Sequence, residues 1–158
     1  MALYKLHIEE FDEVDYELIA IHTSLEDYRL AYFLNQKLPI LLQKNKLQIA
    51  LKEGENYFYR YHFEDEKNDI HWHLIQNKNE VTVEKKETAQ NLFTDTNLEV
   101  STKVYLLPEF KKVDYFLKIE NTELEILDIL NSIHAIDRIA AAYIIEHNQI
   151  KSKNNLIF

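Results

Sequence analysis

An aromatic hairpin is the feature that most constrains how this chain can fold. Aromatic side chains occupy every second position from Tyr57 to Phe63, and apolar ones every second position from Ile70 to Leu74. The positions between them are polar except for Phe58. Alternation with period two on both sides of a short polar link predicts two antiparallel strands. A two-residue turn at residues 67–68 pairs Phe63 with Trp72 and gathers the aromatic side chains on one face of the hairpin.

The aromatic face of this hairpin has three possible roles. It can be core beneath a layer of helices, an exposed patch that binds protein, or a platform on which RNA bases stack. The last role requires basic residues beside the aromatic ones, and Arg60 alone is close. We therefore predict core for the aromatic stripe, which consists of Tyr57, Tyr59, Tyr61, Phe63 and Trp72.

The polar face of the hairpin carries a candidate metal site. In the predicted register His71 and His73 project from one face, and His62 lies across from His73. Such an arrangement can supply three nitrogen ligands to zinc, and Glu64, opposite His71, can orient a ligand or serve as a base. The same alternation is typical of any half-solvated hairpin. No cofactor is therefore the first prediction, and zinc is the alternative.

Residues 14–22 predict a strand that leads into a helix. The segment alternates at first and then becomes continuously apolar. Thr23 and Glu26 have the spacing of a capping box, which predicts a helix over residues 25–38. Pro39 helps to end that helix, because the residue before a proline avoids the helical region.

The same succession recurs 99 residues later. A strand is predicted over residues 113–119, and Thr122 with Glu125 repeats the capping-box spacing before a second helix. At this offset 7 of 22 positions are identical over residues 14–35. The similarity suggests a duplicated strand–helix unit and, as a specific architecture, a ferredoxin-like pair of split units. Alternatively, any strand that leads into a capped helix looks alike.

The remaining segments complete a prediction of fold class. Three further strands are predicted, over residues 47–52, 81–83 and 102–107. Residues 84–100 are polar and predict mostly irregular structure. Together the elements predict one α+β domain over residues 1–158, with a mostly antiparallel sheet and helices packed on one face.

The apolar segment at residues 136–147 can be a helix or a strand. Its three successive alanines, Ala140, Ala141 and Ala142, favour a helix. A helix that is apolar all round is either buried or covered by another chain. The segment therefore also suggests a homodimer.

Composition argues against several kinds of catalytic site. The only glycine is Gly54, whereas phosphate-binding loops, dinucleotide fingerprints and nucleophile elbows need several glycines. The chain has no cysteine, which excludes disulfides, thiolate nucleophiles and metal sites that need sulfur. The sequence therefore favours a protein that is not an enzyme.

Net charge and hydropathy bear on partners and location. The chain has 27 acidic and 18 basic residues, a formal charge of −9. A negative field repels phosphate backbones and anionic membrane surfaces, so we expect neither nucleic acid nor a membrane as a partner. The first residues lack the pattern of a secretory signal, and no apolar run is long enough to span a membrane. The predicted location is the cytoplasm.

Residues 107–115 resemble the signature of the IPExxxVDY family, a bacterial family. The one departure is Leu107, which stands where the signature has isoleucine. The family has no assigned activity, so the resemblance implies no catalytic residue, cofactor or substrate. The matching residues are Pro108, Glu109, Val113, Asp114 and Tyr115.

The residues of this signature predict a corner between two strands. Pro108 cannot donate to a strand ladder and suits a strand end or a turn, and Asp114 can accept hydrogen bonds from nearby backbone. The corner can be a rigid structural element, or it can bind a partner or ligand through Glu109 and Asp114.

The predicted function is a protein-interaction or regulatory module that binds a protein partner or a second copy of the chain. The alternative is a metal-binding protein or metal-dependent enzyme that uses His62, His71 and His73.

Overall fold

The computed structural model describes residues 15–51, 56–85 and 98–158. The described part holds two α-helices, ten strands and three short 3-10 helices. In chain order these are β1 (Tyr16–Thr23), α1 (Asp27–Lys37), β2 (Gln43–Lys44), β3 (Ile49–Ala50), β4 (Tyr57–Phe58), β5 (Arg60–Asp65), β6 (Ile70–Gln76), β7 (Lys78–Lys85), β8 (Leu98–Tyr105), η2 (Pro108–Phe110), β9 (Tyr115–Glu120), α2 (Ile126–His134), β10 (Ile139–Ile144), η3 (His147–Gln149) and η4 (Lys153–Leu156).

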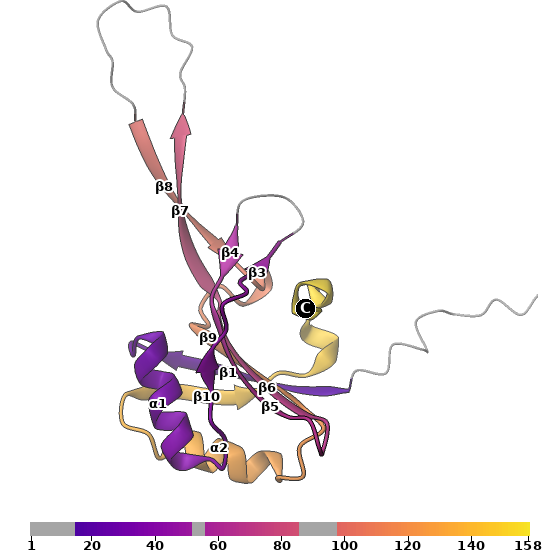
Figure 1. Ribbon diagram of the computed structural model, residues 1–158. Coiled ribbons are helices and arrows are strands. Elements are labelled where there is room, and N and C mark those ends of the chain that lie inside the picture. The colour runs from indigo at the N-terminus through magenta and orange to yellow at the C-terminus, as the bar shows by residue number, and fades with distance from the viewer. Residues whose placement is uncertain (1–14, 52–55, 86–97) are drawn as a thin grey trace, which may run out of the picture.

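Six strands form one antiparallel sheet in the order β10-β1-β9-β6-β5-β2 (Figure 1). Each neighbouring pair in this order is antiparallel. Strands β3 and β4 form a small separate pair, and β7 with β8 forms a hairpin that projects away from the sheet (Figure 1). The prediction of an α+β fold with a mostly antiparallel sheet is confirmed.

Four neighbouring strands, β10, β1, β9 and β6, have a ferredoxin-like connectivity. Strand β9 lies between β1 and β6, so β1 and β6 run parallel, and the connection between them contains α1. Strand β1 likewise lies between β9 and β10, which are connected through α2. Two interlocked split β-α-β units of this kind define the ferredoxin-like arrangement. Strands β2 to β5 are an insertion in the first unit, and the β7–β8 hairpin is an insertion between the two units.

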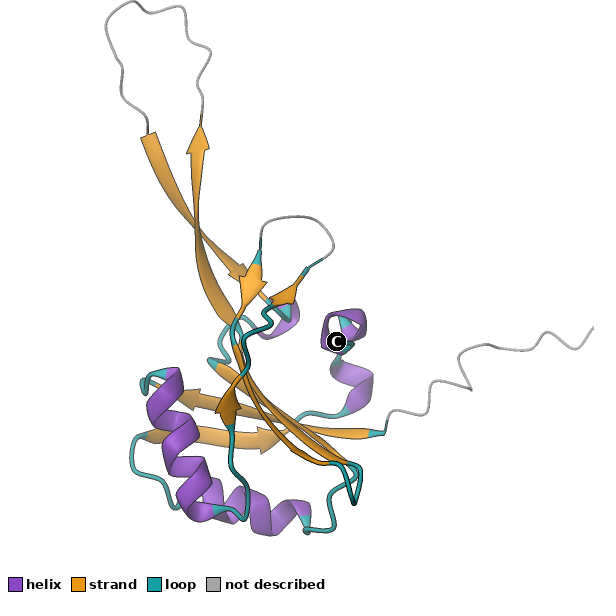
Figure 2. Ribbon diagram, viewed as in Figure 1, coloured by secondary structure: helices purple, strands orange, loops and turns teal. Residues whose placement is uncertain are grey.

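Both helices cover one face of the sheet, as predicted (Figure 2). On this face Ile19 and Ile21 of β1 and Leu117 of β9 share a core with Leu34 of α1 and Ile133 of α2. All five side chains are fully buried. Among the described residues, no helix has the length and hydrophobicity that crossing a bilayer requires.

The opposite face of the sheet is also covered. There Leu18 and Ala20 of β1 and Phe116 of β9 pack under residues near η2 and under the segment that follows β10, which contributes Ile150 and Leu156. Strands buried on both faces have continuous apolar sequences instead of alternating ones. This explains why the end of β1 loses its alternation.

The aromatic hairpin has the predicted register, with Phe63 opposite Trp72. The predicted two-residue turn is wrong. Strand β5 continues to Asp65, which pairs with Ile70 across a four-residue loop. The Asp65 carboxylate accepts hydrogen bonds from the N–H groups of Lys67 and Asn68, at 3.2 and 3.4 Å. Such bonds from an aspartate stabilise the longer turn.

The helix layer covers only part of the aromatic stripe. Tyr61, Phe63 and Trp72 belong to the core beneath the helices, and Trp72 is 1% exposed. Tyr57 and Tyr59 are exposed, so the prediction of core is wrong for these two residues. They lie where β4 gives way to β5, before the part of the hairpin that the helices cover.

Neither predicted capping box forms. Helix α1 begins at Asp27 and α2 at Ile126, and neither has a hydrogen bond from a capping side chain. The hydroxyls of Thr23 and Thr122 instead accept hydrogen bonds from N–H groups two residues later, at 3.1 and 3.2 Å. Thr23 is still paired in β1, so its backbone is committed to the sheet and the helix has to start later.

The two helices correspond in structure at an offset of 99 residues. Leu30 and Leu34 are buried on α1, and Ile129 and Ile133, their counterparts at this offset, are buried on α2. All four residues belong to the same core.

The strands do not match at that offset. Tyr16 packs on the face away from the helices, whereas Tyr115, 99 residues later, packs on the helix face. The second unit has one more residue between its strand and its threonine, and this residue, Asn121, has a left-handed φ of 56°. A shift of one residue moves every strand side chain to the other face of the sheet. The identical residues of the two strands at this offset are therefore not structurally equivalent.

Two predictions of local structure are corrected by strand pairing. Strands β7 and β8 extend into residues 84–100, which were predicted to be mostly irregular, and residues 86–97 lie outside the described part. The helix favoured for residues 136–147 is wrong, because Ile139–Ile144 forms β10 and pairs with β1. This segment is apolar because both faces of the sheet are covered. Ala142 lies in the core on the helix side and Ile145 in the core on the opposite side. The argument for a homodimer from an apolar helix is thereby removed.

Asn77, between β6 and β7, anchors the base of the projecting hairpin. It is 0% exposed. Its Nδ2 donates to the carbonyls of Phe110 and Val113, both at 2.9 Å, and its Oδ1 accepts from the N–H of Leu107 at 3.0 Å. One side chain therefore satisfies three backbone groups around η2.

We predict that Asn77→Ala will lower the free energy of unfolding by at least about 3 kcal/mol, because it leaves three backbone groups near η2 without partners. Urea unfolding followed by circular dichroism measures the change. The control is Asn154→Ala, which removes an exposed amide and should change the free energy by less than about 0.5 kcal/mol. Equal effects of the two substitutions would contradict the role assigned to Asn77.

Candidate functional site

The resemblance signature forms the corner that leads from β8 to β9. Pro108 opens the 3-10 helix η2. The Glu109 carboxylate accepts hydrogen bonds from the backbone N–H groups of Lys151 and Ser152, both at 2.8 Å, and from the Ser152 hydroxyl at 3.0 Å. Val113 is buried in the core on that side of the sheet. Glu109 thus holds the segment that covers the face away from the helices.

Asp114 and Tyr115 make contacts in the opposite direction, toward the end of β1. The two carboxylate oxygens of Asp114 accept hydrogen bonds from the Thr23 N–H and the Lys78 ammonium group, both at 3.0 Å. The Tyr115 hydroxyl donates to the Leu25 carbonyl at 2.8 Å. Burial, together with the carboxylates of Asp27 and Asp114, raises the pKa of Tyr115, so this hydroxyl keeps the proton it donates. The contacts favour a structural role for the corner.

The histidines of the hairpin lie in the predicted register but have different surroundings. His62 is opposite His73, and Glu64 is opposite His71. The His71 ring lies 3.7 Å from the Glu64 carboxylate and 3.1 Å from that of Asp69, measured between the nearest nitrogen and oxygen atoms. The His73 ring instead meets the ring of Phe158 edge-on. Within the described ranges, no three His, Asp or Glu side chains are grouped as a metal site requires.

Positive charge surrounds His73. Burial, together with the charges of Arg60 and Lys118, lowers the pKa of His73 to about 3. The imidazole is therefore neutral at physiological pH, as a metal ligand must be, but the neighbouring guanidinium and ammonium groups repel a metal cation. The positive charges of Arg60 and Lys118 beside His73 favour an anion at this place.

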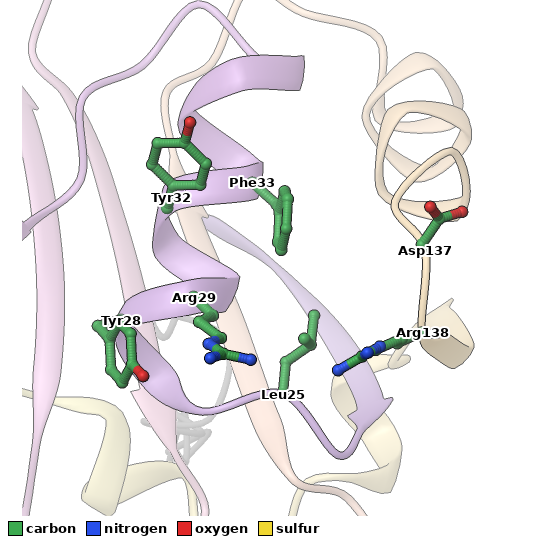
Figure 3. A pocket seen from close by; sticks show the side chains of 7 residues that line it. All are labelled: Leu25, Tyr28, Arg29, Tyr32, Phe33, Asp137 and Arg138. Atoms are coloured by element: carbon green, nitrogen blue, oxygen red, sulfur yellow. The ribbon is translucent and has the colours of Figure 1, made fainter.

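A pocket of about 670 Å³ lies beside the first turns of α1 (Figure 3). Leu25 is buried at its base, and Tyr28 and Tyr32 on α1 are 53% and 58% exposed. The remaining lining residues are Arg29, Phe33, Asp137 and Arg138. Exposed tyrosines beside arginines are the composition that binding hot spots favour.

The two arginines of this pocket point toward one another across Leu25 (Figure 3). Arg29 comes from α1 and Arg138 from the turn before β10. None of the ion pairs among the described residues includes either guanidinium group. The Asp137 carboxylate points away from the Arg138 guanidinium (Figure 3). The pocket therefore combines an apolar base with two cationic groups that share no carboxylate.

Arg138 is held in a strained conformation. Its φ is 70°, in the left-handed region that costs most residues about 1 kcal/mol or more. Its carbonyl accepts a hydrogen bond of 2.8 Å from the Thr23 hydroxyl. Backbone strain that the surrounding structure enforces is typical of binding sites.

Hydrogen bonds from residues of the signature corner position the backbone of this pocket. Asp114 binds the N–H of Thr23, and Thr23 in turn holds the backbone of Arg138. Tyr115 holds the backbone of Leu25, which forms the base of the pocket. The sequence patterns did not indicate the pocket, because its residues come from Leu25, from α1 and from a turn more than 100 positions later. The exposed tyrosines on α1 were the one available signal.

The chain was compared with protein-family models, with curated proteins and with solved structures, and none of them matches. The resemblance of residues 107–115 to the IPExxxVDY signature therefore stays a prediction.

The acid stability of the fold depends in part on Glu109. Burial acts to raise its pKa, but the hydrogen bonds from Ser152 and Lys151 outweigh this effect and hold the pKa below its ordinary value. A carboxyl group with a lowered pKa stabilises the folded state above its unfolded pKa of about 4.3. This stabilisation is lost as the pH falls through the lower, folded pKa.

We predict that Glu109→Gln weakens the docking of residues 145–158 and flattens the loss of stability below about pH 4.3. Hydrogen exchange of that segment, together with urea unfolding between pH 3 and pH 7, measures both effects. Glu123→Gln, which removes an exposed carboxylate, serves as the control. Unchanged exchange protection of the segment in Glu109→Gln would contradict the assigned contact.

Proposed function

We propose that the protein is a non-catalytic, cytoplasmic interaction module that binds an acidic, partly apolar segment of a protein partner in the pocket beside α1. The apolar and aromatic lining suits the side chains of a peptide, and the two guanidinium groups suit a carboxylate. Tyrosine and arginine are among the residues that contribute most to binding energy at protein interfaces.

The observation that carries this proposal is the approach of Arg29 and Arg138 across Leu25 (Figure 3). Two cations that face one another raise each other's electrostatic energy, and an anion between them removes that cost. A guanidinium group binds a carboxylate through two parallel hydrogen bonds, which gives orientation as well as affinity. Charge complementarity therefore selects an acidic side chain of the partner.

The strain at Arg138 supports the same conclusion. The hydrogen bond from Thr23 holds the Arg138 backbone before any partner binds, so less conformational freedom is lost on association. Asp114 and Tyr115 support this part of the pocket from the adjacent strand. The proposal gives these two signature residues a positioning role.

Binding can be tested with the full chain and a displayed library of random dodecapeptides. We expect selected sequences to contain Asp or Glu close to an aromatic or aliphatic residue. Synthetic peptides from the selection are then titrated against variants. Arg29→Gln should weaken the dissociation constant roughly 10- to 100-fold, because it removes a charged hydrogen-bond donor.

Arg138→Gly is the matched test at the other side of the pocket. It should weaken binding by a similar factor. Glycine adopts positive φ without strain, so the free energy of unfolding should stay the same or rise by up to about 1 kcal/mol. Loss of binding without loss of stability separates recognition from folding.

Lys37→Gln is the control, because it removes one positive charge from the same helix but outside the pocket. It should leave the affinity unchanged. Selected peptides without acidic residues, or equal effects of Lys37→Gln and Arg29→Gln, would overturn the proposal.

A further inference from the structure

Four basic side chains gather on the face of the sheet away from the helices. Strand pairing places His62, His73 and Lys118 in one row across β5, β6 and β9. Arg60 lies on the same face two residues before His62 on β5. In a chain with a net charge of −9, this is a local concentration of positive charge.

The ring of Phe158 covers this basic cluster. Its centroid lies 4.6 Å from the Arg60 guanidinium carbon and 4.8 Å from the Lys118 nitrogen. The His73 ring meets it edge-on, with 5.0 Å between centroids. An aromatic ring attracts cations through its π face, but it has no lone pair that can accept a hydrogen bond from an imidazole or a guanidinium group.

Three nitrogen atoms of the cluster are buried without a hydrogen-bond partner among the described residues. They are Nε of Arg60, Nδ1 of His62 and Nδ1 of His73. A buried polar atom without a partner destabilises the folded state, and such atoms in a native structure need an explanation. When both imidazoles carry their proton on Nδ1, all three atoms are donors, and one acceptor within reach of them would satisfy all three.

The charges of the cluster are only partly balanced. The Lys118 ammonium group is paired with the Glu120 carboxylate at 2.6 Å and donates to the Leu156 carbonyl at 3.0 Å. The ion pairs of the described residues leave Arg60 without a carboxylate. Burial lowers the pKa of Arg60, which is the effect of a positive charge that has lost water without gaining an anion.

We propose that this cluster binds a small oxyanion, either a phosphate or a carboxylate group, and that the Phe158 ring occupies the site in its absence. The oxygen atoms accept hydrogen bonds from Arg60, His62 and His73. The site lies on the other face of the sheet from the pocket beside α1 and does not depend on the function proposed for that pocket.

The first test uses inorganic phosphate as the probe and calorimetric titration of the full chain. Phe158→Ala should tighten phosphate binding about tenfold, because the ring no longer competes for the site. Ile157→Ala changes the neighbouring exposed apolar side chain and should leave binding unchanged. Arg60→Gln should weaken binding at least tenfold, and Lys37→Gln, which removes an exposed positive charge on α1, should have no effect.

A second measurement follows His73 by nuclear magnetic resonance. The charged groups around this imidazole are Arg60 and His62 on β5, His71 on its own strand, and Lys118 on β9. A bound anion offsets their charge, so the pKa of His73 should rise from its lowered value when phosphate saturates the protein. Sodium chloride at matched ionic strength should not produce this rise.

Titration with acetate distinguishes the two oxyanions. Tighter binding of phosphate identifies a phosphate site, and equal or tighter binding of acetate identifies a carboxylate site. The proposal is overturned if neither anion binds wild type or Phe158→Ala, or if Arg60→Gln binds phosphate as wild type does. The comparison of Arg60→Gln with wild type stands even if Phe158→Ala fails to fold.

Discussion

The fold depends on one partly buried carboxylate, that of Asp114. Its two oxygens bind the Thr23 N–H at the end of β1 and the Lys78 ammonium group at the start of β7. The backbone of the same residue donates to Ile21 and accepts from Asn77. Strand β1, the projecting hairpin and the signature corner therefore meet at a single residue. Because a charged hydrogen bond is stronger than a neutral one, this junction can fix the strand end against which the helix layer and the pocket are built.

The sheet that results has two covered faces, and each carries a different kind of candidate site. On the helix side, the turn before β10 places Arg138 opposite Arg29 beside an apolar base. On the other side, the segment after β10 places Phe158 over buried basic groups. In both cases a part of the chain that follows α2 completes a surface formed by earlier strands and helices. The chemistry of both sites is cationic, although the protein as a whole is acidic.

Local patterns predicted those elements whose side chains obey one periodicity. The alternation around Phe63 and Trp72 predicted both strands and their register, because one face of that hairpin packs in the apolar core and the other carries mostly polar side chains. The threonine–glutamate spacing failed to predict the helix starts, because Thr23 remains paired in the sheet. The alanines of β10 favoured a helix by propensity, but pairing with β1 overrides a preference of a few tenths of a kcal/mol per residue. The histidines were found by spacing and Arg60 lies close to them in the sequence, whereas Lys118 reaches His73 from a strand 45 positions later.

The sequence by itself determined an acidic α+β protein with an aromatic hairpin, without glycine-rich phosphate loops and without cysteine chemistry. These properties follow from composition and from periodicities that act over a few residues. Tertiary structure alone decided the strand order, the contacts of the signature corner, the approach of Arg29 and Arg138 across Leu25, and the cluster beneath Phe158. Each of these depends on contacts between residues far apart in the chain, where the cost of closing the loop and the burial of both sheet faces determine which groups meet.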